Sequence, residues 1–589
     1  MQVNRLFALL SLVMLLMGFP SGASAHDDRC EPLYRRYIQV LKEKKTAPSP
    51  AAVARLVGAQ LPDGSWPNIE YDDKRTNSWR GGKHLKNLNT LALHWLYTGD
   101  YDALDACHGA LEYWFSRPEL GTHHWWYKMI YVPREMGQAL LILKNELTEQ
   151  EKEAALRIMN ESFGHKNATG QNKVALASNR LVLGLFNDDY ELVSRSYGQI
   201  ASEVVITDKE GLQEDMSYHQ HGPMLQFGNY GLGYAKSMSE WVYLFEGTSL
   251  EFPKDNRDLI CRYVQDGLRW VVWNGYFDMN ALGRQVYKGT QTSKTKVVDQ
   301  VISNLGISSK EPHGARYFPR SDFGVYRADK WYASIRMQST RIKGYEYLKE
   351  NMKAYFSSDG ALLVRVEGDE YDDVAACWNW LHVPGTTTYD NGTDILGREA
   401  EFPYNRSDKV FGKVDGEVMV AAMDYDRDGL KARKAWFFYP GGIVCLGAGI
   451  TMDGGGEVVT TVNQCNLSGK VAAGKDWAFH DSVAYLMLDS DRFVADQVCR
   501  YGNWSYIKRG AGKEQEKRDF FEMYIPHGKA PKNSSYSYMV VPAVKDVKTA
   551  RKMASKDVKV IRNTQDVQSV SICGRTYTVD WQSGSIKIY

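Results

Sequence analysis

Apolar residues in the N-terminal half of the chain recur at the spacing of an α-helix. From about residue 30 to 315, apolar side chains return every three or four positions, as at Leu88 and Leu91. Thr148 followed by Glu151 has the spacing of a capping box, which predicts that a helix begins there. Helices that continue over such a length predict an α/α toroid or another large helical array rather than a simple bundle.

The pattern changes after Pro319, where short runs rich in β-branched and aromatic residues alternate with turn residues. Pro440-Gly441-Gly442 lies between two such runs and predicts a hairpin turn. The clearest predicted strands span 331–337, 361–366, 417–423 and 435–438. We therefore expect a multidomain α+β protein, with an N-terminal α/α toroid followed by antiparallel β-sandwich domains. The expected divisions are a signal peptide over 1–25, the toroid over 26–325, a central β-sandwich over 326–485 and a C-terminal β-sandwich over 486–589.

Length and charge narrow the classes of protein that remain. The 589 residues exceed one ordinary domain of ~150 residues, so several structural units are expected. The 72 Lys and Arg nearly cancel the 71 Asp and Glu, which argues against a general nucleic-acid binder and a polybasic membrane protein. The 16 Trp and 36 Tyr offer flat faces that suit a large core and also the stacking of sugar rings.

The first residues have the layout of a cleavable secretory signal. Arg5 precedes the apolar run 6–19, and Ala23-Ser24-Ala25 stands before His26. The run is short for a membrane span and no later stretch reaches ~18 uninterrupted apolar residues, so no membrane anchor is expected. We expect a secreted or periplasmic protein. The eight cysteines form no close cluster that would indicate a structural zinc site, and their spacing leaves any disulfide pairing open.

The densest polar segment of the helical half spans 214–221 and is followed by 227–231. It combines two histidines with two tyrosines, Tyr218 and Tyr230, and several glycine or proline breakers. A histidine and a tyrosine that converge on one carbon atom could transfer a proton. Spacing alone nevertheless favours a structural role at the base of a loop. His219 and His221 are a weak metal signal, because no third ligand stands at a suitable spacing.

Several short motifs occur in a characteristic order. They are His124-Trp125-Trp126 with Val132-Pro133, Thr169-Gly170-Gln171-Asn172, His219-Gln220-His221-Gly222-Pro223 with Tyr230, and Glu350-Asn351-Met352 with Ser358-Asp359-Gly360. Together they resemble the polysaccharide lyase family that contains chondroitin AC lyases, hyaluronate lyases and xanthan lyases, and the chondroitin AC type is the most similar. The resemblance extends over nearly the whole chain after residue 25 and implies the same toroid and β-sandwich fold.

The resemblance also implies a set of catalytic residues. It gives the catalytic histidine as His221, the tyrosine as Tyr230 and the carboxylate-binding asparagine as Asn172. The arginine of the site falls on Arg284. The glutamate from the first β-domain falls on Glu350, although Glu346 is close enough to leave the register open.

These groups suit β-elimination from a 4-linked uronic acid. Asn172 and His221 could hydrogen-bond the uronate carboxylate, so that the charge of the developing carbanion spreads as an enolate. Tyr230 beside the cation Arg284 would remove the C5 proton and then protonate the departing O4. Glu350 would orient His221 or Arg284. The product would be an unsaturated uronate, and no cofactor is required.

Other residues implied by the resemblance would bind the polysaccharide. Trp125 and Trp126, with His124, form an aromatic platform for sugar rings, although one of the two indoles could belong to the core. Lys288 stands where family members often carry a second arginine. A lysine keeps the positive charge but lacks the planar guanidinium that binds carboxylate or sulfate in a bidentate way.

A structural calcium site is possible in the β-domain. Asp424, Asp426 and Asp428 alternate in a way that could suit calcium, but an acidic turn before Lys431 and Arg433 is the simpler explanation.

The sequence leaves three readings of function open. The first is a lyase for chondroitin sulfate and hyaluronan, acting as a monomer on an anionic polysaccharide, and a lyase for another uronate polymer such as xanthan is its variant. The second is a glycoside hydrolase, which needs two carboxylates flanking the bond, whereas Glu214 and Asp215 are chain neighbours. The third is a non-catalytic glycan-binding protein.

Overall fold

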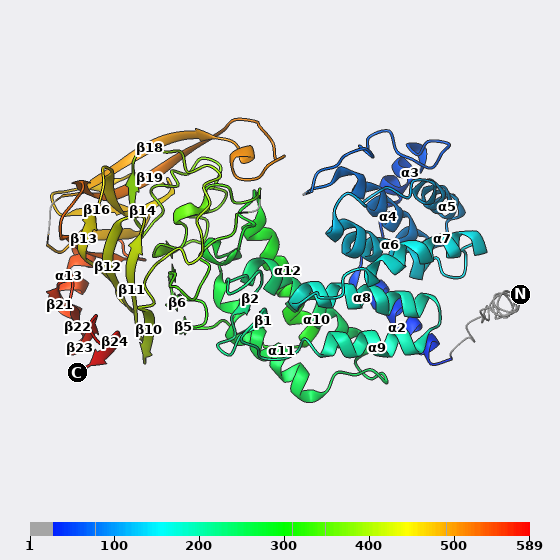
Figure 1. The fold of residues 1–589 in the computed structure, drawn as a ribbon, viewed down its shortest axis with the longest axis horizontal. Helices are drawn as coiled ribbons and strands as arrows, with labels where there is room; N and C mark the ends of the chain where they lie inside the picture. The colour runs from blue at the N-terminus through cyan, green and yellow to red at the C-terminus, as the bar shows by residue number, and fades with distance from the viewer. Residues whose placement is uncertain (1–27, 77, 309, 348, 490–491) are drawn as a thin grey trace, which may run out of the picture. The chain divides into compact units, whose positions relative to one another are not determined.

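A computed structural model describes residues 28–589, apart from 77, 309, 348 and 490–491. Its chain forms two compact units (Figure 1). The first, here called the helical unit, holds the chain up to Ala168 with Asn172–Ala201 and Leu244–Glu251. The second, here called the mixed unit, holds Thr169–Gln171, Ser202–Tyr243 and Phe252–Tyr589. The predicted signal peptide, 1–25, lies outside the described residues.

Amphipathic helices make up the helical unit. Leu88 and Leu91 are fully buried on one face of α4, which ends at Gly99 in the left-handed conformation, as an αL cap requires. The capping box predicted at Thr148 is present, because its hydroxyl accepts from the Glu151 N–H while the Glu151 carboxylate accepts from the Thr148 N–H. The helices of this unit are α2 (Cys30–Lys44), α3 (Pro50–Gly58), α4 (Lys83–Thr98), α5 (Tyr101–Ser116), α6 (Val132–Ile142), α7 (Glu149–Asn160), most of α8 (Gly170–Phe186) and α9 (Tyr190–Ala201).

The mixed unit begins with short elements and three longer helices. Its helices are α10 (Leu232–Phe245), α11 (Lys254–Asp266) and α12 (Thr290–Leu305). Two small hairpins, β1 (Gly211–Leu212) with β2 (Tyr218–His219) and β3 (Val272–Trp273) with β4 (Tyr276–Phe277), stand among them. Strand structure then takes over at Gly314, a few residues before the change of pattern that the sequence predicts.

Four larger antiparallel sheets follow. The first contains β5 (Gly314–Phe318), β6 (Phe323–Arg327), β7 (Tyr332–Arg336) and β8 (Ala361–Arg365). The second has the order β10-β11-β12-β13-β20-β17-β16-β15 and contains β10 (Val410–Asp415), β11 (Val418–Arg427), β12 (Leu430–Tyr439), β13 (Gly442–Met452), β15 (Ala472–Ala473), β16 (Trp477–His480), β17 (Val483–Met487) and β20 (Ser534–Val541). The third has the order β18-β19-β14-β9 and contains β9 (Thr387–Asp390), β14 (Glu457–Asn466), β18 (Val494–Gly502) and β19 (Glu516–Lys529).

The fourth sheet closes the chain after α13 (Val547–Asp557). It contains β21 (Val558–Asn563), β22 (Val567–Ile572), β23 (Arg575–Asp580) and β24 (Ser585–Ile588). Buried Trp581 from this region packs in one hydrophobic cluster with Phe437 and Leu446 of the eight-stranded sheet. The final sheet is therefore attached to the rest of the mixed unit by a shared core.

Sheet pairing does not follow the expected division at residue 485. β20 pairs with β13 on one side and with β17 on the other, so strands from before and after that point belong to one sheet. The expected boundary thus falls inside β17 and not in a linker. A hairpin turn at Pro440-Gly441 joins β12 to β13, as the sequence predicts.

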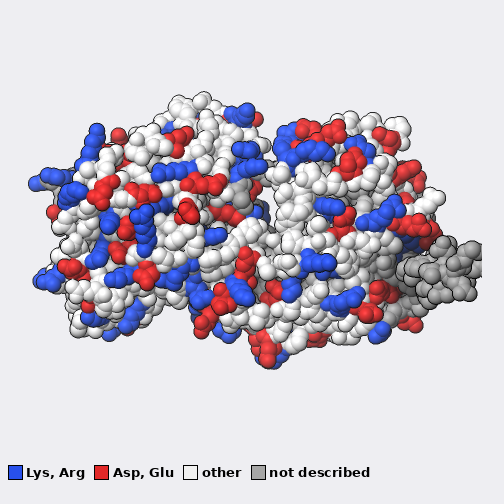
Figure 2. Space-filling model, viewed as in Figure 1, with Lys and Arg blue, Asp and Glu red and all other residues white. Residues whose placement is uncertain are grey.

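Charge and cysteine chemistry add two observations. On the face shown in Figure 2, acidic and basic side chains are interspersed. All eight cysteines lie in the described part of the chain, and none forms a disulfide there.

Among the helices that the structure describes, none is long and apolar enough to cross a membrane.

Candidate active site

His221 lies in a tight turn that follows β2 in the mixed unit. Its φ angle is 62°, a left-handed value that costs a non-glycine residue about 1–2 kcal/mol. Two hydrogen bonds hold the turn: the Gly222 N–H donates to Glu210 Oε1 over 2.8 Å, and the Lys343 N–H donates to the Pro223 carbonyl over 3.0 Å. The histidine ring is therefore presented by a strained backbone fixed from two directions.

Tyr230 lies in a π-helical turn, Phe227–Gly231, that leads into α10. The Gly231 N–H donates to the Gln226 carbonyl over 2.8 Å, which is the wide spacing of a π-turn. The ring centroids of Tyr230 and His221 are 4.8 Å apart with planes at 60°. The structure thus brings together the histidine and tyrosine that the sequence pairs.

Arg284 follows Gly283, whose φ of 64° and close approach to Gln226 both require glycine, since a Cβ there would stand 2.4 Å from Gln226 Oε1. The guanidinium makes three contacts. Its Nη1 donates to Glu346 Oε2 over 2.7 Å and its Nε to Glu350 Oε2 over 2.9 Å. Its Nη2 donates to the Tyr230 hydroxyl oxygen over 3.3 Å.

Both glutamates come from the long connection 337–360 between β7 and β8. Glu346 also contacts His221 Nδ1, and Gln226 donates to its Oε2 over 3.2 Å. Glu350 has no such contact with His221 in the described structure. Glu346 thus contacts both His221 and Arg284, whereas Glu350, the residue that the sequence favours, contacts Arg284.

Burial and ion pairing set the electrostatics of this group. Burial raises the pKa of Tyr230 above its usual value, and the neighbouring Arg284 charge opposes that rise. Burial alone would raise the pKa of Glu346, but the hydrogen bond from His221 and the charge of Arg284 outweigh it and hold that pKa below the usual range. Arg284 remains protonated because its ion pair with Glu346 outweighs its burial and raises its pKa.

Lys294 lies beside this cluster, and the sequence analysis did not single it out. The buried Lys294 ammonium donates to Gln285 Oε1 over 2.6 Å and to the Gly228 carbonyl. Burial, with the repulsion of Arg284, lowers the pKa of Lys294 to about 8. Lys294 lies in a largely polar helix, so hydrophobic spacing gave no indication that its side chain points inward.

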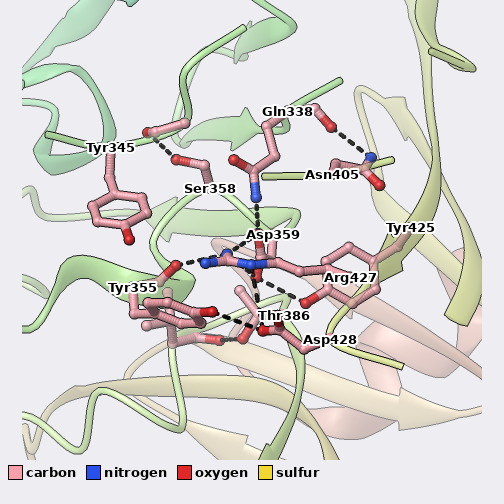
Figure 3. Close-up of polar contacts among 12 residues, drawn as sticks. Gln338, Tyr345, Tyr355, Ser358, Asp359, Thr386, Asn405, Tyr425, Arg427 and Asp428 are labelled. Carbon is pink, nitrogen blue, oxygen red and sulfur yellow. Dashed lines mark hydrogen bonds and ion pairs between the residues drawn. The ribbon is translucent and has the colours of Figure 1, made fainter. Parts of the chain in front are cut away.

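A buried ion pair anchors the segment that carries both glutamates. The Arg427 guanidinium and the Asp359 carboxylate are 1% and 0% exposed and lie 3.1 Å apart (Figure 3). Arg427 Nη1 also donates to the Tyr355 carbonyl over 2.8 Å, and Tyr425 donates to Asp359 Oδ2 over 2.9 Å. The guanidinium carbon stands 5.9 Å from the ring of Tyr345, the residue before Glu346. These contacts fix both ends of the 345–359 stretch.

Within the mixed unit, Lys288 and His219 have partners outside this cluster. Lys288 is largely exposed and pairs with Glu516 over 3.0 Å. His219 is buried and exchanges a hydrogen bond with Ser321 over 2.9 Å, and burial lowers its pKa to about 4. Asn172 belongs to the helical unit, in the first turn of α8, whereas His221 belongs to the mixed unit.

The aromatic residues predicted as a sugar platform lie in the helical unit. Trp125 is 38% exposed and packs against His165, with ring centroids 4.9 Å apart. Trp126 is half-buried and stacks on Tyr131 at 5.9 Å, with Arg134 5.9 Å from its ring centroid. Neither indole is buried in the core, so both could offer part of a face to a ligand.

The three aspartates considered for calcium have protein partners. Asp424 pairs with Arg433 over 3.4 Å and Asp426 with Lys431 over 3.8 Å. Asp428 accepts a hydrogen bond from Tyr355 over 2.8 Å. Within the described residues, no group of three or more His, Cys, Asp or Glu is arranged to hold a metal ion. Asp424 and Asp426 lie in β11 opposite Arg433 and Lys431 of β12, and Asp428 lies in the turn between these strands.

Comparison with known proteins assigns the chain to a family. The N-terminal alpha-helical domain of polysaccharide lyase family 8 matches residues 36–316, and the super-sandwich domain of that family matches residues 313–553. The two matches follow one another along most of the chain. The protein therefore belongs to polysaccharide lyase family 8 and is a polysaccharide lyase.

Particular relatives extend this assignment. Chondroitinase-AC of Pedobacter heparinus is 28% identical over 558 residues, which cover 86% of this chain and 79% of that protein. A hyaluronate lyase of Thermasporomyces composti is 24% identical over 608 residues, covering 86% and 76%. A solved chondroitinase AC lyase has a TM-score of 0.85 and 25% identity, covering 94% of this chain and 89% of that one. This likeness confirms the predicted fold class of a helical toroid followed by β-sandwich domains.

Replacing Arg427 with Met should destabilise the protein by about 3–5 kcal/mol, because Asp359 would remain buried without its partner. Denaturant unfolding measures the change. Arg551→Met is the matched control, since its ion pair with Asp476 is about half exposed and should contribute less than about 1 kcal/mol. Equal stability of the two variants would contradict a stabilising role for the buried pair.

Replacing Glu346 with Gln should change how stability depends on pH. A carboxyl whose pKa is lowered by folding stabilises the native state above its unfolded pKa of about 4.3, and this stability is lost as the pH falls through the lower folded value. The difference in unfolding free energy between wild type and Glu346→Gln should therefore shrink on acidification. The exposed Glu514→Gln is the control, and a difference that stays constant with pH would contradict the predicted ionisation.

Proposed function

We propose that the protein cleaves glycosaminoglycans that contain uronic acid, chondroitin sulfate and hyaluronan among them, by β-elimination. The observation that carries this proposal is the Arg284 guanidinium, bound by Glu346 and Glu350 and directed at the Tyr230 hydroxyl 3.3 Å away. The names of its relatives, a chondroitinase and a hyaluronate lyase, support this class of substrate.

Tyr230 is the proton carrier in the proposed reaction. Its phenolate takes the proton from C5 of the uronate, and the electrons of that bond form a double bond between C4 and C5 as the C4–O4 bond breaks. The phenol then returns the proton to the departing O4, so no water is consumed. Arg284 stabilises the phenolate, and thus opposes the rise that burial produces in the pKa of Tyr230.

Neutralising the uronate carboxylate is the second requirement. Glu346 accepts the hydrogen bond from His221 Nδ1, and the cationic form of the ring, which carries a second N–H at Nε2, would donate that N–H to the substrate. We assign Asn172 to the same carboxylate by resemblance to the family. Hydrogen bonds from these two groups would let the developing charge spread as an enolate. Glu350 orients Arg284 and exchanges no proton.

Residues outside this centre would bind neighbouring sugars. We assign Trp125 and Trp126, with His124, to an aromatic platform, which the partial exposure of both indoles supports. Lys288 would meet an anionic group of the chain. Its exposed ammonium has Glu516 as a partner, so a sulfate or carboxylate would compete with that ion pair.

We also propose that the enzyme is exported and acts as a monomer. The signal-like pattern over 1–25 supports export. Degradation of a polymeric glycosaminoglycan outside the cytoplasm would need no membrane anchor and no cofactor.

A xanthan-type uronate polymer is the alternative substrate within this family. Lys288 in place of an arginine keeps this alternative open, because a lysine does not bind carboxylate or sulfate in a bidentate way.

The alternative of a glycoside hydrolase has less support. Asp215 caps its own turn by accepting from the Ser217 N–H over 2.9 Å, and it accepts from the Arg320 N–H over 2.7 Å. It is thus used structurally, and Glu214 is its chain neighbour.

The assay is incubation of the full chain with chondroitin sulfate, hyaluronan and xanthan, followed by the ultraviolet absorbance of the new conjugated double bond. Absorbance on the first two polymers supports the proposal. New reducing ends without absorbance would indicate hydrolysis instead. Absorbance with xanthan alone would show that the substrate is the xanthan-type polymer and not a glycosaminoglycan.

Replacing Tyr230 with Phe should lower kcat by about 10²–10⁴-fold, because only the proton-carrying oxygen is removed. Binding of the polysaccharide, measured by calorimetry, should change little. The exposed Tyr501→Phe, in β18, is the control and should keep wild-type rates. If Tyr230→Phe kept a near-normal kcat, Tyr230 could not be the base that removes the C5 proton.

A further inference from the structure

A segment from the β-rich part of the mixed unit reaches the stretch that carries Glu350. It spans 503–515, between β18 and β19, and contains a short helical turn, Trp504–Tyr506. The Met352 N–H donates to the Ile507 carbonyl over 3.0 Å, and the Arg509 N–H donates to the Lys349 carbonyl over 2.9 Å. These two bonds flank Lys508 on one segment and Glu350 on the other, so the pair is held in register.

The stretch around Glu350 has a strained backbone. Lys349 and Asn351, its two neighbours, have φ angles of 59° and 55°, which few non-glycine residues adopt. Such strain persists only where surrounding contacts hold it, and it concentrates at functional sites. The bonds to Ile507 and Arg509 are contacts of this kind.

Lys508 itself contacts Glu350 and the ring of Tyr287. Its ammonium lies 3.5 Å from Glu350 Oε1, and the two side chains are only 15% and 12% exposed. It also lies 4.0 Å from the centroid of the Tyr287 ring, within range of a cation–π interaction. A charge pair so far removed from water interacts more strongly than a surface pair of the same separation.

Lys508 supplies the second positive charge among the ion pairs around Arg284, and Lys294 is a further cation nearby. Arg284 carries one positive charge and touches two carboxylates, Glu346 and Glu350. Without a further cation these three groups would be net negative, beside the phenol and in the path of an anionic substrate. The other titratable groups that face them are His221, Tyr230, Tyr287 and Lys294.

Lys288 is a poor candidate for the balancing charge. It is 62% exposed and bound to Glu516, which also accepts a hydrogen bond from Trp504 Nε1 over 3.1 Å. Its effect is to fasten the far end of the same segment. Lys508, in contrast, contacts Glu350 directly, on the carboxylate oxygen that Arg284 does not bind.

We propose that Lys508 is a positioning residue of the active site, which holds Glu350 against Arg284 and neutralises the excess negative charge of the cluster. This inference rests on the proposed lyase function and deepens it. The β18–β19 connection thereby sets how well the site accepts an anionic chain and how readily Tyr230 ionises. Removal of the ammonium would raise the pKa of Tyr230 further, since the two carboxylates already oppose its ionisation.

The test compares Lys508→Met, Lys508→Arg and, as control, Lys513→Met on the exposed part of the same segment. The polymer is whichever of chondroitin sulfate, hyaluronan and xanthan the wild type cleaves. Lys508→Met should lower kcat/KM by about 10- to 100-fold, the range seen when a residue that orients an active-site ligand is lost. The ascending limb of its pH–rate profile should move to higher pH. Lys508→Arg should restore most of the rate and the wild-type profile, and Lys513→Met should match wild type.

Two results would overturn the inference while the wild type remains an active lyase. One is a Lys508→Met variant with wild-type kcat/KM and pH profile. The other is equal impairment of Lys508→Met and Lys508→Arg with an unmoved pH profile, which would indicate a packing role alone. If the wild type formed no unsaturated product from any of the three polymers, the result would contradict the proposed function, and the inference about Lys508 would fall with it.

Discussion

The candidate site depends on the stabilisation of one buried cation. A guanidinium removed from water requires carboxylates close by, because an isolated buried charge is very unfavourable. Arg284 obtains them from Glu346 and Glu350, which belong to a connection within the first β-sheet. Tyr230 and His221, the proposed catalytic pair, are therefore held by contacts from that connection. The proposed site thus depends on the β-rich part of the mixed unit as well as on the segment that carries these two residues.

Backbone strain follows from the same requirement. His221, Lys349 and Asn351 all have positive φ angles, and each lies at or beside a group that contacts the cluster. Hydrogen bonds from residues remote in the chain hold these conformations, those to Glu210 at one turn and those to Ile507 and Arg509 at the other. The buried pair of Arg427 and Asp359 adds a rigid base under the intervening stretch. Several separate parts of the mixed unit thus share in fixing a few polar atoms.

Local sequence signals predict much of this architecture, but not its long-range contacts. The capping box at Thr148 and the hairpin at Pro440 depend on neighbouring residues, and both are present. His221 and Tyr230 lie close together in the chain, so their pairing was also accessible from their motif. The sequence could not decide between Glu346 and Glu350, because both lie in an irregular connection without hydrophobic periodicity. Lys508 comes from a polar, lysine-rich stretch that resembles any solvated loop, and only tertiary pairing gives it a role.

The link between Arg284 and Tyr230 can be measured without turnover. In protein with isotope-labelled tyrosine, the NMR signal of the Tyr230 ring Cζ, assigned by its loss in Tyr230→Phe, reports ionisation of the phenol directly. The pKa of Tyr230 should be higher in Arg284→Met than in wild type, because the two carboxylates would then act on it unopposed, whereas Arg284→Lys should stay closer to wild type. A Tyr230 pKa that is unchanged or lower in Arg284→Met would contradict the view that this arginine controls the proton carrier.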